Sequence, residues 1–448
     1  MMNHAKFFNA DSRRREHPYL VRLRLPSEKL QRSVNLANGL PCPANFPFKE
    51  ATVTLHSGEV LHISPRQMEV AMQYGAIAGL HELVTQLRDM ATKLFNPPHM
   101  DERGLIVTGG AAHSANLILQ TFVESGDYVF VQESTYPTIL DTLRPTDVKV
   151  VSVPNDSEGL RADLLAEALS KTPAARRKLL YVIPNGDNPT GITMSEKRRR
   201  EIYDVVCKYD LLIAEDDPYY FIYFGAEQAP PTFLSLDTEG RVLRIDSFSK
   251  SVGPGLRLGY ITADKPFTDK IQALQAIMIG SPCCVSQAIL SELLRHWGYE
   301  GFMKFTSKGT ETYRKKRDMV LQAADKHLTG LCEWKAGDGM FLWLKVLGLE
   351  DTKHIIELEC EKRDLILLPG SACLWDSAQP SPYIRACYSL ATPDKADRGF
   401  KILADVIKEE LKKNKSKNKS GDAVASGHKE AASGFTHEPK KHTNGAAT

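Results

Sequence analysis

A lysine set among small hydroxyls, glycines and an arginine is the part of this sequence best suited to covalent chemistry. The segment begins Ser247-Phe248-Ser249-Lys250 and continues through a glycine-rich turn to Arg257. A lysine amine can attack an aldehyde carbon, and hydroxyl and guanidinium groups bind phosphate. The segment therefore suits a phosphorylated aldehyde cofactor. A helix N-terminus with a solvated lysine is the alternative, and the segment alone does not separate the two.

Two aspartates and a tyrosine form a second candidate group. Asp216 and Asp217 follow an apolar run, and Tyr219 lies three residues after Asp216. A carboxylate placed there can pair with a pyridinium nitrogen and keep it protonated, which makes the ring an electron sink. The tyrosine can donate to a ring oxygen. Spacing does not tell which aspartate faces the ring, and an aspartate after a strand is often only a helix cap.

An asparagine turn and a distant arginine complete the candidates. Asn188 lies in the segment 184–191, where its amide could bond to the same ring oxygen, although a plain Asn-Pro turn is the simpler interpretation. Arg385, in Tyr383-Ile384-Arg385-Ala386, could hold a substrate carboxylate through two parallel hydrogen bonds if it is buried. A lone arginine is more often a surface residue, so Arg385 depends on the other motifs for its weight.

Short apolar runs predict the sheet that positions these residues. The runs are bounded by Gly, Pro or Asp, are separated by helix-length segments, and lie at 105–108, 128–132, 149–153, 178–183, 211–215 and 242–246. This alternation predicts parallel strands joined by right-handed crossovers. Such sheets bind ligands at the carboxyl ends of their strands, which is where Lys250 would lie.

The remaining chain predicts covering helices, a smaller unit and a tail. Residues 195–209 predict a helix with Ile202, Val205 and Val206 on its apolar face. A long charged helix over 302–327, an apolar run at 339–344 and a helix near 352–362 are typical of an α+β domain. From residue 412 the chain has too few apolar residues to offset its ordering entropy, which predicts a disordered tail over 412–448. A basic anchor for an acidic surface is the less favoured interpretation of this tail.

Composition excludes several classes of function. The chain has 448 residues, of which 42% are hydrophobic, and a formal net charge of +2, so nothing in its charge favours nucleic acid. Its eight cysteines lack metal or redox spacing, which predicts reduced thiols and no metal site. No apolar run is long enough to cross a membrane. We expect an intracellular soluble protein of the cytoplasm or mitochondrial matrix. The Arg-rich start is loosely typical of a mitochondrial presequence, although Asp11 and Glu16 interrupt it.

Taken together, the motifs resemble class I/II aminotransferases of fold type I, over roughly residues 2–410. The resemblance is carried by Asn188-Pro189-Thr190-Gly191, Asp216 with Tyr219, Ser247 to Lys250, Arg257 and Arg385. It is strongest for the kynurenine/2-aminoadipate aminotransferase subgroup, in which the phosphate arginine lies seven residues after the lysine, as Arg257 does here. The family implies the pyridoxal 5′-phosphate (PLP)-dependent transferase fold. Its parts would be an N-terminal arm (1–45) that joins the small domain and covers the active site, a large PLP-binding α/β domain with a mainly parallel central sheet (46–295), and a smaller α+β domain (296–411).

The resemblance also implies a role for each candidate residue. Lys250 would hold PLP as a Schiff base and carry the substrate proton, with Asp216 and Tyr219 as its catalytic partners. The implied PLP contacts are Asp216 at the pyridinium nitrogen, Tyr219 and Asn188 at the ring oxygen, Tyr136 on the ring, Ser247, Ser249 and Arg257 at the phosphate, and Tyr74 from a partner subunit. The implied substrate-binding residues are Arg385, Asn188, Gly39, Arg22 and Tyr74.

One loop departs from the subgroup. Where the subgroup has Ser-Gln, this chain has Ala111-Ala112, so one hydroxyl and one amide are missing. Backbone N–H groups at the following helix N-terminus can still hold phosphate, and we expect both alanines to act through their backbone alone. PLP affinity is expected to be weaker than usual. In the N-terminal arm, Arg24 could take the place of Arg22.

The implied activity is a ping-pong transamination. The amino group of kynurenine, 2-aminoadipate or another aromatic or long-chain amino acid would pass to 2-oxoglutarate, in a homodimer with shared active sites. The partners would be small amino acids and 2-oxo acids, with neither nucleic acid nor membrane. A PLP-dependent lyase or synthase with the same residues is one alternative. A non-catalytic PLP-binding regulatory module is another, against which counts the lack of a helix-turn-helix segment before residue 30.

Overall fold

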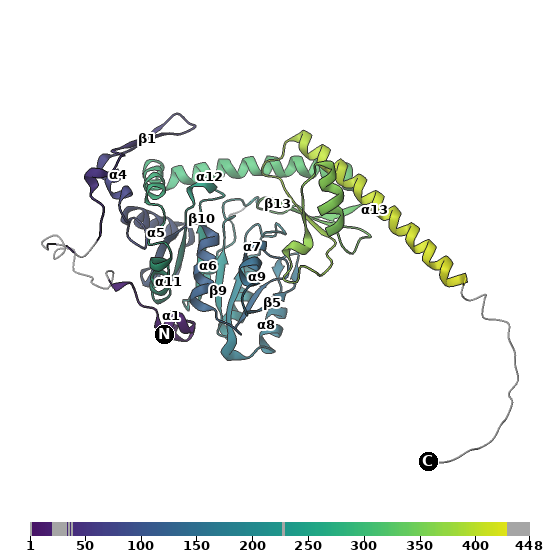
Figure 1. Cartoon of the computed structure of the whole chain (residues 1–448), viewed down its shortest axis with the longest axis horizontal. Coiled ribbons are helices and arrows are strands. Elements are labelled where there is room, and N and C mark those ends of the chain that lie inside the picture. The colour runs from purple at the N-terminus through teal and green to yellow at the C-terminus, as the bar shows by residue number, and fades with distance from the viewer. Residues whose placement is uncertain (1, 20–33, 35, 37–38, 226–228, 428–448) are drawn as a thin grey trace, which may run out of the picture.

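Two β-sheets, joined by one long helix, organise the chain. The computed structural model describes residues 2–19, 34, 36, 39–225 and 229–427. A seven-stranded sheet is followed by a four-stranded sheet. Helix α12 (Cys284–Leu328) runs from the first to the second (Figure 1).

The large sheet has the strand order β3-β11-β10-β9-β8-β4-β5. Its strands are β3 (Arg103–Thr108), β4 (Tyr128–Gln132), β5 (Lys149–Val153), β8 (Arg177–Val182), β9 (Leu212–Asp216), β10 (Val242–Ser247) and β11 (Gly259–Asp264). All six strands expected from the apolar runs form, and the mainly parallel α/β sheet is confirmed. The seventh strand, β11, was not expected and pairs antiparallel with both β10 and β3.

Helices cover both faces of this sheet, because successive side chains of a strand point to opposite sides. On β9, Leu212 and Ala214 belong to one apolar cluster and Ile213 to another. The helices that cover the large sheet within the first cluster are α6 (Ala111–Phe122), α7 (Pro137–Leu143) and α11 (Lys265–Met278), and this cluster continues to the four-stranded sheet through α12 and α13 (Pro393–Gly427). Those of the second are α5 (His81–Phe95), α8 (Ala162–Ser170), α9 (Glu196–Lys208) and α10 (Phe233–Leu236). The helix expected at 195–209 is thereby confirmed as α9, and the Ser195 side chain caps it by accepting from the Arg198 N–H.

The small sheet has the strand order β12-β13-β15-β14. Its strands are β12 (Cys332–Trp334), β13 (Phe341–Val346), β14 (Leu368–Pro369) and β15 (Tyr383–Cys387). Helix α12 loses helical geometry at Gly298 (φ 59°, ψ −174°), close to the expected boundary between residues 295 and 296. The helix expected near 352–362 forms as a π-helical turn (Ile355–Cys360) followed by a 3₁₀ turn (Glu361–Arg363).

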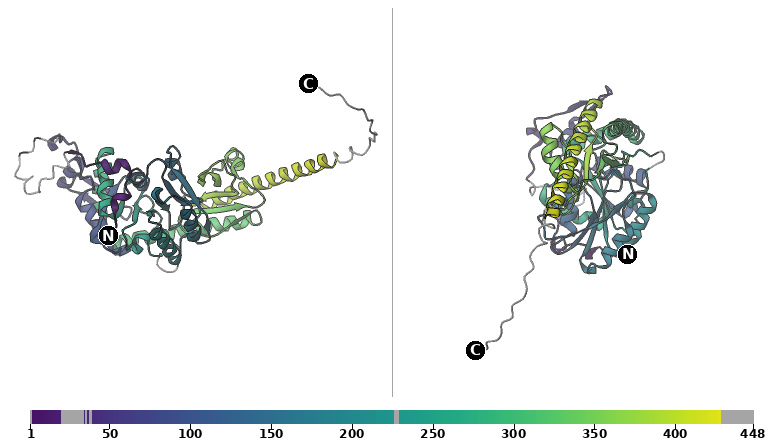
Figure 2. Two further views of the ribbon diagram at one scale, coloured as in Figure 1. Left: turned by 90° about the horizontal axis from the view of Figure 1, so that it is seen from below. Right: turned by 90° about the vertical axis from the view of Figure 1, so that its right-hand side faces the viewer.

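Helix α13 (Pro393–Gly427) crosses the position where the sequence predicted disorder. It packs on α12 through its first turns, in which Phe400, Leu403 and Ile407 are buried, and continues helical past residue 412. Once a helix has started, each added residue gains a hydrogen bond, and lysine is a good helix former. The described part of the expected tail is therefore helical up to Gly427 and extends away from the body (Figure 2). Residues 428–448 lie outside the described part.

The first residues of the chain pack on the large sheet's helices. Phe7 and Phe8 contact the Phe267 ring edge-on, and Phe8 stacks on Phe122. The N-terminal elements are η1 (His4–Lys6), α1 (Ala10–Arg14), η2 (Pro43–Asn45), β1 (Ala51–Thr54), β2 (Val60–Ile63) and α4 (Pro65–Met72). The remaining elements are η3 (Met100–Glu102), β6 (Asn155–Asp156), β7 (Gly159–Leu160), η4 (Ala174–Arg176), η5 (Pro254–Leu256) and η8 (Gly370–Cys373). Among the described residues, none of the helices is both long and apolar enough to cross a membrane.

Candidate active site

The candidate residues gather because their loops follow neighbouring strands of one sheet. Strands β8, β9 and β10 are adjacent and parallel, so their carboxyl ends meet at one edge. The loop after β8 carries Asn188, the end of β9 carries Asp216, and the loop after β10 carries Lys250. Strand β3 leads at the same edge into the Gly109-Gly110 turn and helix α6.

Asp216 is a buried carboxylate with one satisfied and one free oxygen. The Tyr181 hydroxyl donates to Asp216 Oδ2 over 2.5 Å, while Oδ1 is buried and has no hydrogen-bond partner. Burial raises the pKa of Asp216 to about 6, although the Tyr181 hydrogen bond lowers it. At neutral pH the group is thus mostly ionised, with one oxygen available to a cationic N–H donor.

The neighbouring Asp217 already has a cationic partner within the protein. Its Oδ2 accepts from Arg244 Nη1 at 3.0 Å and from Asn185 Nδ2 at 2.7 Å. The fully buried Arg244 also binds Asp246 at 2.8 and 3.1 Å, and so ties together the ends of β9 and β10. Both aspartates keep a buried Oδ1 without a hydrogen-bond partner, but of the two only Asp217 forms an ion pair among the described residues.

Asn188, Tyr219 and Arg385 form a hydrogen-bonded chain across the two sheets. Arg385 Nη1 donates to Asn188 Oδ1 over 2.7 Å, and Asn188 Nδ2 donates to the Tyr219 hydroxyl over 3.4 Å. The Arg385 guanidinium lies over the Phe341 ring, 4.5 Å from its centroid. Arg385 is half-buried, not enclosed, because it reaches from β15 into the space between the sheets. Burial raises the pKa of Tyr219 far above its usual value, so this phenol remains a donor.

Backbone amides, hydroxyls and a guanidinium converge beside the N-terminus of α6. Arg257 donates to the Gly109 carbonyl at 3.0 Å and to Ser249 Oγ at 3.5 Å, and Ser247 Oγ accepts from the Ser249 N–H at 3.2 Å. Gly110 has φ +95°, and a Cβ there would lie 2.8 Å from Arg257 Nη2, so only glycine fits. The first N–H groups of α6, including those of Ala111 and Ala112, have no intrahelical acceptor. This arrangement suits a phosphate group.

Lys250 follows in the turn after β10 and is half-buried. Within the described residues it forms neither a hydrogen bond nor an ion pair, so its amine is available for chemistry. Tyr136, at the start of α7, is partly buried near Tyr181 and Tyr219.

Two expected residues, Tyr74 and Gly39, are exposed in the single chain. Tyr74 is 77% exposed, and Gly39 is exposed with nothing within 4 Å of a Cβ built on it. Arg22 lies outside the described residues, as does Arg24. Within the described chain, no group of three or more His, Cys, Asp or Glu side chains could hold a metal ion.

Sequence reasoning missed Tyr181, Arg244 and Phe341, all of which contact the candidates. Tyr181 and Arg244 lie inside the apolar runs that predicted β8 and β10, and a polar residue inside such a run was the available signal. Phe341 carried no signal beyond its place in an apolar strand.

Comparison with known proteins identifies the family. The family model for "Aminotransferase class I and II" matches residues 36–403. The chain is a class I/II aminotransferase. The kynurenine/alpha-aminoadipate aminotransferase, mitochondrial, of Bos taurus is 39% identical over 427 residues, which cover 92% of this aminotransferase and 100% of the relative. The corresponding Rattus norvegicus protein is 38% identical, with 91% and 100% covered. Among solved structures, the aminotransferase Aro8 of Candida albicans has a TM-score of 0.81 at 26% identity, with 92% and 99% covered.

This aminotransferase is a PLP-dependent enzyme, as the family requires. The kynurenine aminotransferase of Pyrococcus horikoshii, solved in complex with PMP, KYN and KYA, has a TM-score of 0.72 at 25% identity and covers 91% of this chain and 98% of its own. The residues present fit the cofactor on three observations: the free Oδ1 of Asp216, the unpaired amine of Lys250, and the glycine-lined cradle beside Arg257.

Proposed function

We propose that the enzyme transfers the amino group of kynurenine, 2-aminoadipate or another aromatic or long-chain amino acid to 2-oxoglutarate. In the first half-reaction the amino acid becomes a 2-oxo acid and its nitrogen stays on the enzyme; in the second, 2-oxoglutarate takes that nitrogen and becomes glutamate. The observation that carries the proposal is the Arg385–Asn188 pair, which presents a guanidinium to a carboxylate beside the aromatic rings of Phe341 and Tyr219. The names of the mammalian relatives support the same substrates.

We assign the cofactor contacts as follows. Asp216 holds the ring nitrogen in its protonated form, Tyr219 and Asn188 donate to the ring oxygen, and Tyr136 stacks on the ring. Phosphate is bound by Ser247, Ser249, Arg257 and the backbone N–H groups of Ala111 and Ala112. When bound, PLP supplies an electron sink for the substrate's Cα–H bond. Lys250 holds the cofactor and its amine accepts the Cα proton.

Substrate positioning falls to Arg385, which binds the α-carboxylate with Asn188. Gly39, Arg22 and Tyr74 are proposed to close over the rest of the substrate. A bidentate guanidinium–carboxylate pair fixes the orientation of the Cα–H bond as well as the affinity, because both hydrogen bonds are directional.

A homodimer is part of the proposal, with Tyr74 serving the partner's cofactor. Tyr74 is 77% exposed in the single chain, and Ile277, Met278 and Ile279 at the end of α11 are 60%, 43% and 48% exposed. Gly75 lies against Cys284, the first residue of α12, close in the chain to these side chains. An exposed apolar group of this kind favours a protein interface. Sedimentation would test it, since an active monomer would contradict the shared site.

We also propose domain limits and a location. The large domain would span 46–295, the small domain 296–411, and the arm 1–45. The enzyme would be intracellular, in the cytoplasm or mitochondrial matrix; the word mitochondrial in the relatives' names and the eight free cysteines support this.

The first experiment is an absorbance spectrum of purified enzyme with each candidate amino acid and no oxo-acid acceptor. Loss of the band of lysine-bound PLP with kynurenine or 2-aminoadipate would establish the donor. Subsequent release of glutamate equal to the 2-oxo acid formed would distinguish transamination from lyase or synthase chemistry. Lys250→Ala should abolish turnover with the fold intact, and substantial residual turnover would overturn the assignment.

A further inference from the structure

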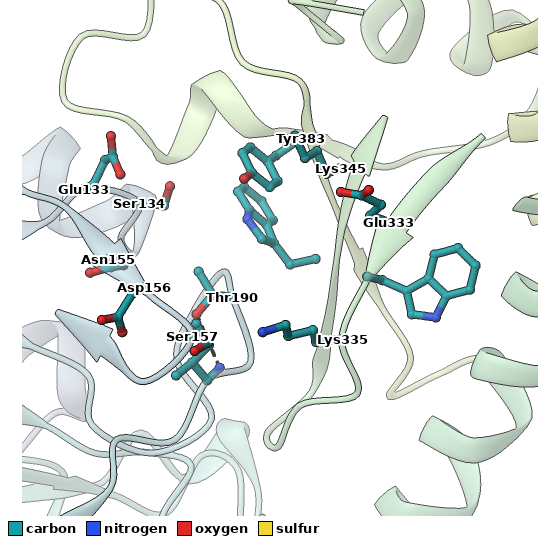
Figure 3. A pocket seen from close by; sticks show the side chains of 13 residues that line it. Glu133, Ser134, Asn155, Asp156, Ser157, Thr190, Glu333, Lys335, Lys345 and Tyr383 are labelled. Carbon is teal, nitrogen blue, oxygen red and sulfur yellow. Dashed lines mark hydrogen bonds between the residues drawn. The ribbon is translucent and has the colours of Figure 1, made fainter. Parts of the chain in front are cut away.

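A cavity of about 490 Å³ lies between the two sheets, beside the candidate active site. One wall comes from the large sheet's loops, with Glu133, Ser134 and Asn155. The other is formed by strands β12, β13 and β15 of the small sheet. In Figure 3, Tyr383 and Lys335 extend from the small-sheet strands toward the loops that carry Ser134 and Ser157.

An aromatic pair lines the small-sheet wall. Trp343 and Tyr383 stack with 5.1 Å between ring centroids and 6° between ring planes. The strand register pairs Lys345 with Tyr383, so Lys345 lies on the same face as both rings. Both rings are only partly buried. Since each ring already covers one face of the other, a further ring can stack on the outer face of the pair.

The two walls of the cavity carry unpaired side chains of opposite charge. Within the described residues, neither Lys335 nor Lys345 on the small-sheet wall forms an ion pair. On the opposite wall, Glu133 is likewise unpaired there, and Asn155 Oδ1 is buried without a hydrogen-bond partner.

Two further carboxylates bear on the charge of the cavity. Asp156 is already bound by both terminal nitrogens of Arg198, at 2.9 and 3.0 Å. Glu333 lies across the strand from Lys345 and partly offsets its charge. What remains is a positive pole around Lys335 and a negative pole at Glu133, on opposite walls.

We propose that this cavity binds a small aromatic zwitterion of the amino-acid type. Its ring stacks on the outer face of the Trp343–Tyr383 pair, its carboxylate pairs with Lys335, assisted by Lys345, and its ammonium group faces Glu133. The site is separate from the carboxylate clamp, because neither Asn188 nor Arg385 lines it. It is nevertheless close: Thr190 and Tyr383, which do line it, lie two residues from Asn188 and Arg385. The inference does not depend on which amino donor the enzyme uses.

The test is calorimetric titration of the PLP-loaded enzyme with 4-(aminomethyl)benzoate. This probe has opposite charges at the two ends of one ring and lacks an α-amino acid group. We expect one molecule bound per chain, with the cofactor's absorbance unchanged. The double substitution Lys335→Gln/Lys345→Gln should weaken binding at least 10-fold. The matched control is the double substitution Lys353→Gln/Lys401→Gln. It changes two exposed lysines of the C-terminal part of the chain that do not line the cavity, and it should leave binding of the probe unchanged.

Two shortened probes complete the design. Benzylamine lacks the carboxylate and 4-methylbenzoate lacks the ammonium group, so each should bind at least 10-fold more weakly. Equal affinity of the wild type and the Lys335/Lys345 variant would overturn the proposal. An absorbance change on binding would also overturn it, because it would place the probe at the cofactor. So would the absence of any binding heat with a wild-type enzyme that turns over normally.

Discussion

Removing the Tyr181 hydroxyl should weaken PLP binding at low pH and leave it almost unchanged at high pH. Tyr181 donates to Asp216 Oδ2 over 2.5 Å, and both side chains are buried. In Tyr181→Phe the ring still fills its place, whereas the carboxylate loses its only hydrogen bond among the described residues. The substitution therefore changes the ionisation of Asp216 with little change in packing.

The size of the effect follows from linkage. A hydrogen bond to a charged group contributes about 1.5–3 kcal/mol, and one pKa unit corresponds to about 1.4 kcal/mol, so the pKa of Asp216 should rise by about 1–2 units from its present value of about 6. In the proposed contact with the ring nitrogen, bound PLP requires the ionised carboxylate of Asp216. Well above the pKa the free and bound enzymes both hold the carboxylate ionised, and the lost hydrogen bond cancels. Well below this pKa the free enzyme holds the carboxylate protonated and only the bound enzyme holds it ionised. PLP binding must then ionise a carboxylate that has lost its hydrogen bond, so PLP affinity should fall about 10- to 100-fold.

The assay is the dissociation constant of PLP for the unloaded enzyme, followed by absorbance at about pH 5.5 and about pH 9. Tyr203→Phe is the matched control, because it removes a 2.9 Å Tyr–Asp hydrogen bond to Asp237 outside the site. We expect the control to match the wild type at both pH values. An equal loss of PLP affinity in Tyr181→Phe at both pH values would refute the reasoning, since it would show general damage to the site. Unchanged PLP affinity at both pH values would refute it as well.

Three further predictions concern the phosphate cradle, the buried carboxylate and the carboxylate clamp. Gly110→Ala places a Cβ 2.8 Å from Arg257 Nη2 at φ +95° and should raise the dissociation constant of PLP at least about 10-fold. The control is Gly58→Ala, which has a similar φ of +91° but lies in open space. Chemical denaturation of this control should show only the backbone strain of about 1–2 kcal/mol, and its PLP binding should not change. Asp216 has its pKa raised from 3.8 to about 6, so the stability this group contributes in its protonated form is lost as pH rises from about 4 to about 6. In the unloaded enzyme, Asp216→Asn should therefore raise the free energy of unfolding at pH 8 by up to about 3 kcal/mol, and by about half as much at pH 5; no gain at pH 8 would contradict the assigned burial. Arg385→Lys keeps the charge and loses the paired hydrogen bonds, so the KM for the amino donor should rise about 100-fold with PLP affinity unchanged; an equal loss of PLP affinity would contradict a role confined to substrate.

Much of the fold was predictable because it depends on short-range patterns. The apolar runs located six of the seven strands of the large sheet, since strands buried on both faces must be continuously apolar. Strand β11 was not predicted, because it pairs antiparallel with β10 and β3 and the direction of strand pairing depends on contacts between distant segments. The sequence also failed to predict that α13 stays helical beyond residue 412. The helix begins in a segment that is buried against the body, whereas the prediction of disorder considered only the composition of the charged residues that follow.

For the site, the sequence by itself determined which chemical groups are available: the lysine, the glycine turn, the two acids, and the asparagine and arginine. Motif order and spacing record these directly, because each motif is a local loop attached to one strand. Only the tertiary structure decided how they act together. It showed that Asp217 pairs with Arg244 whereas Asp216 forms no ion pair among the described residues, and that Arg385 reaches Asn188 from 197 residues away in the chain. Hydrogen bonding and burial arise between segments distant in sequence, and these contacts set the pKa of a carboxylate and the direction of a guanidinium.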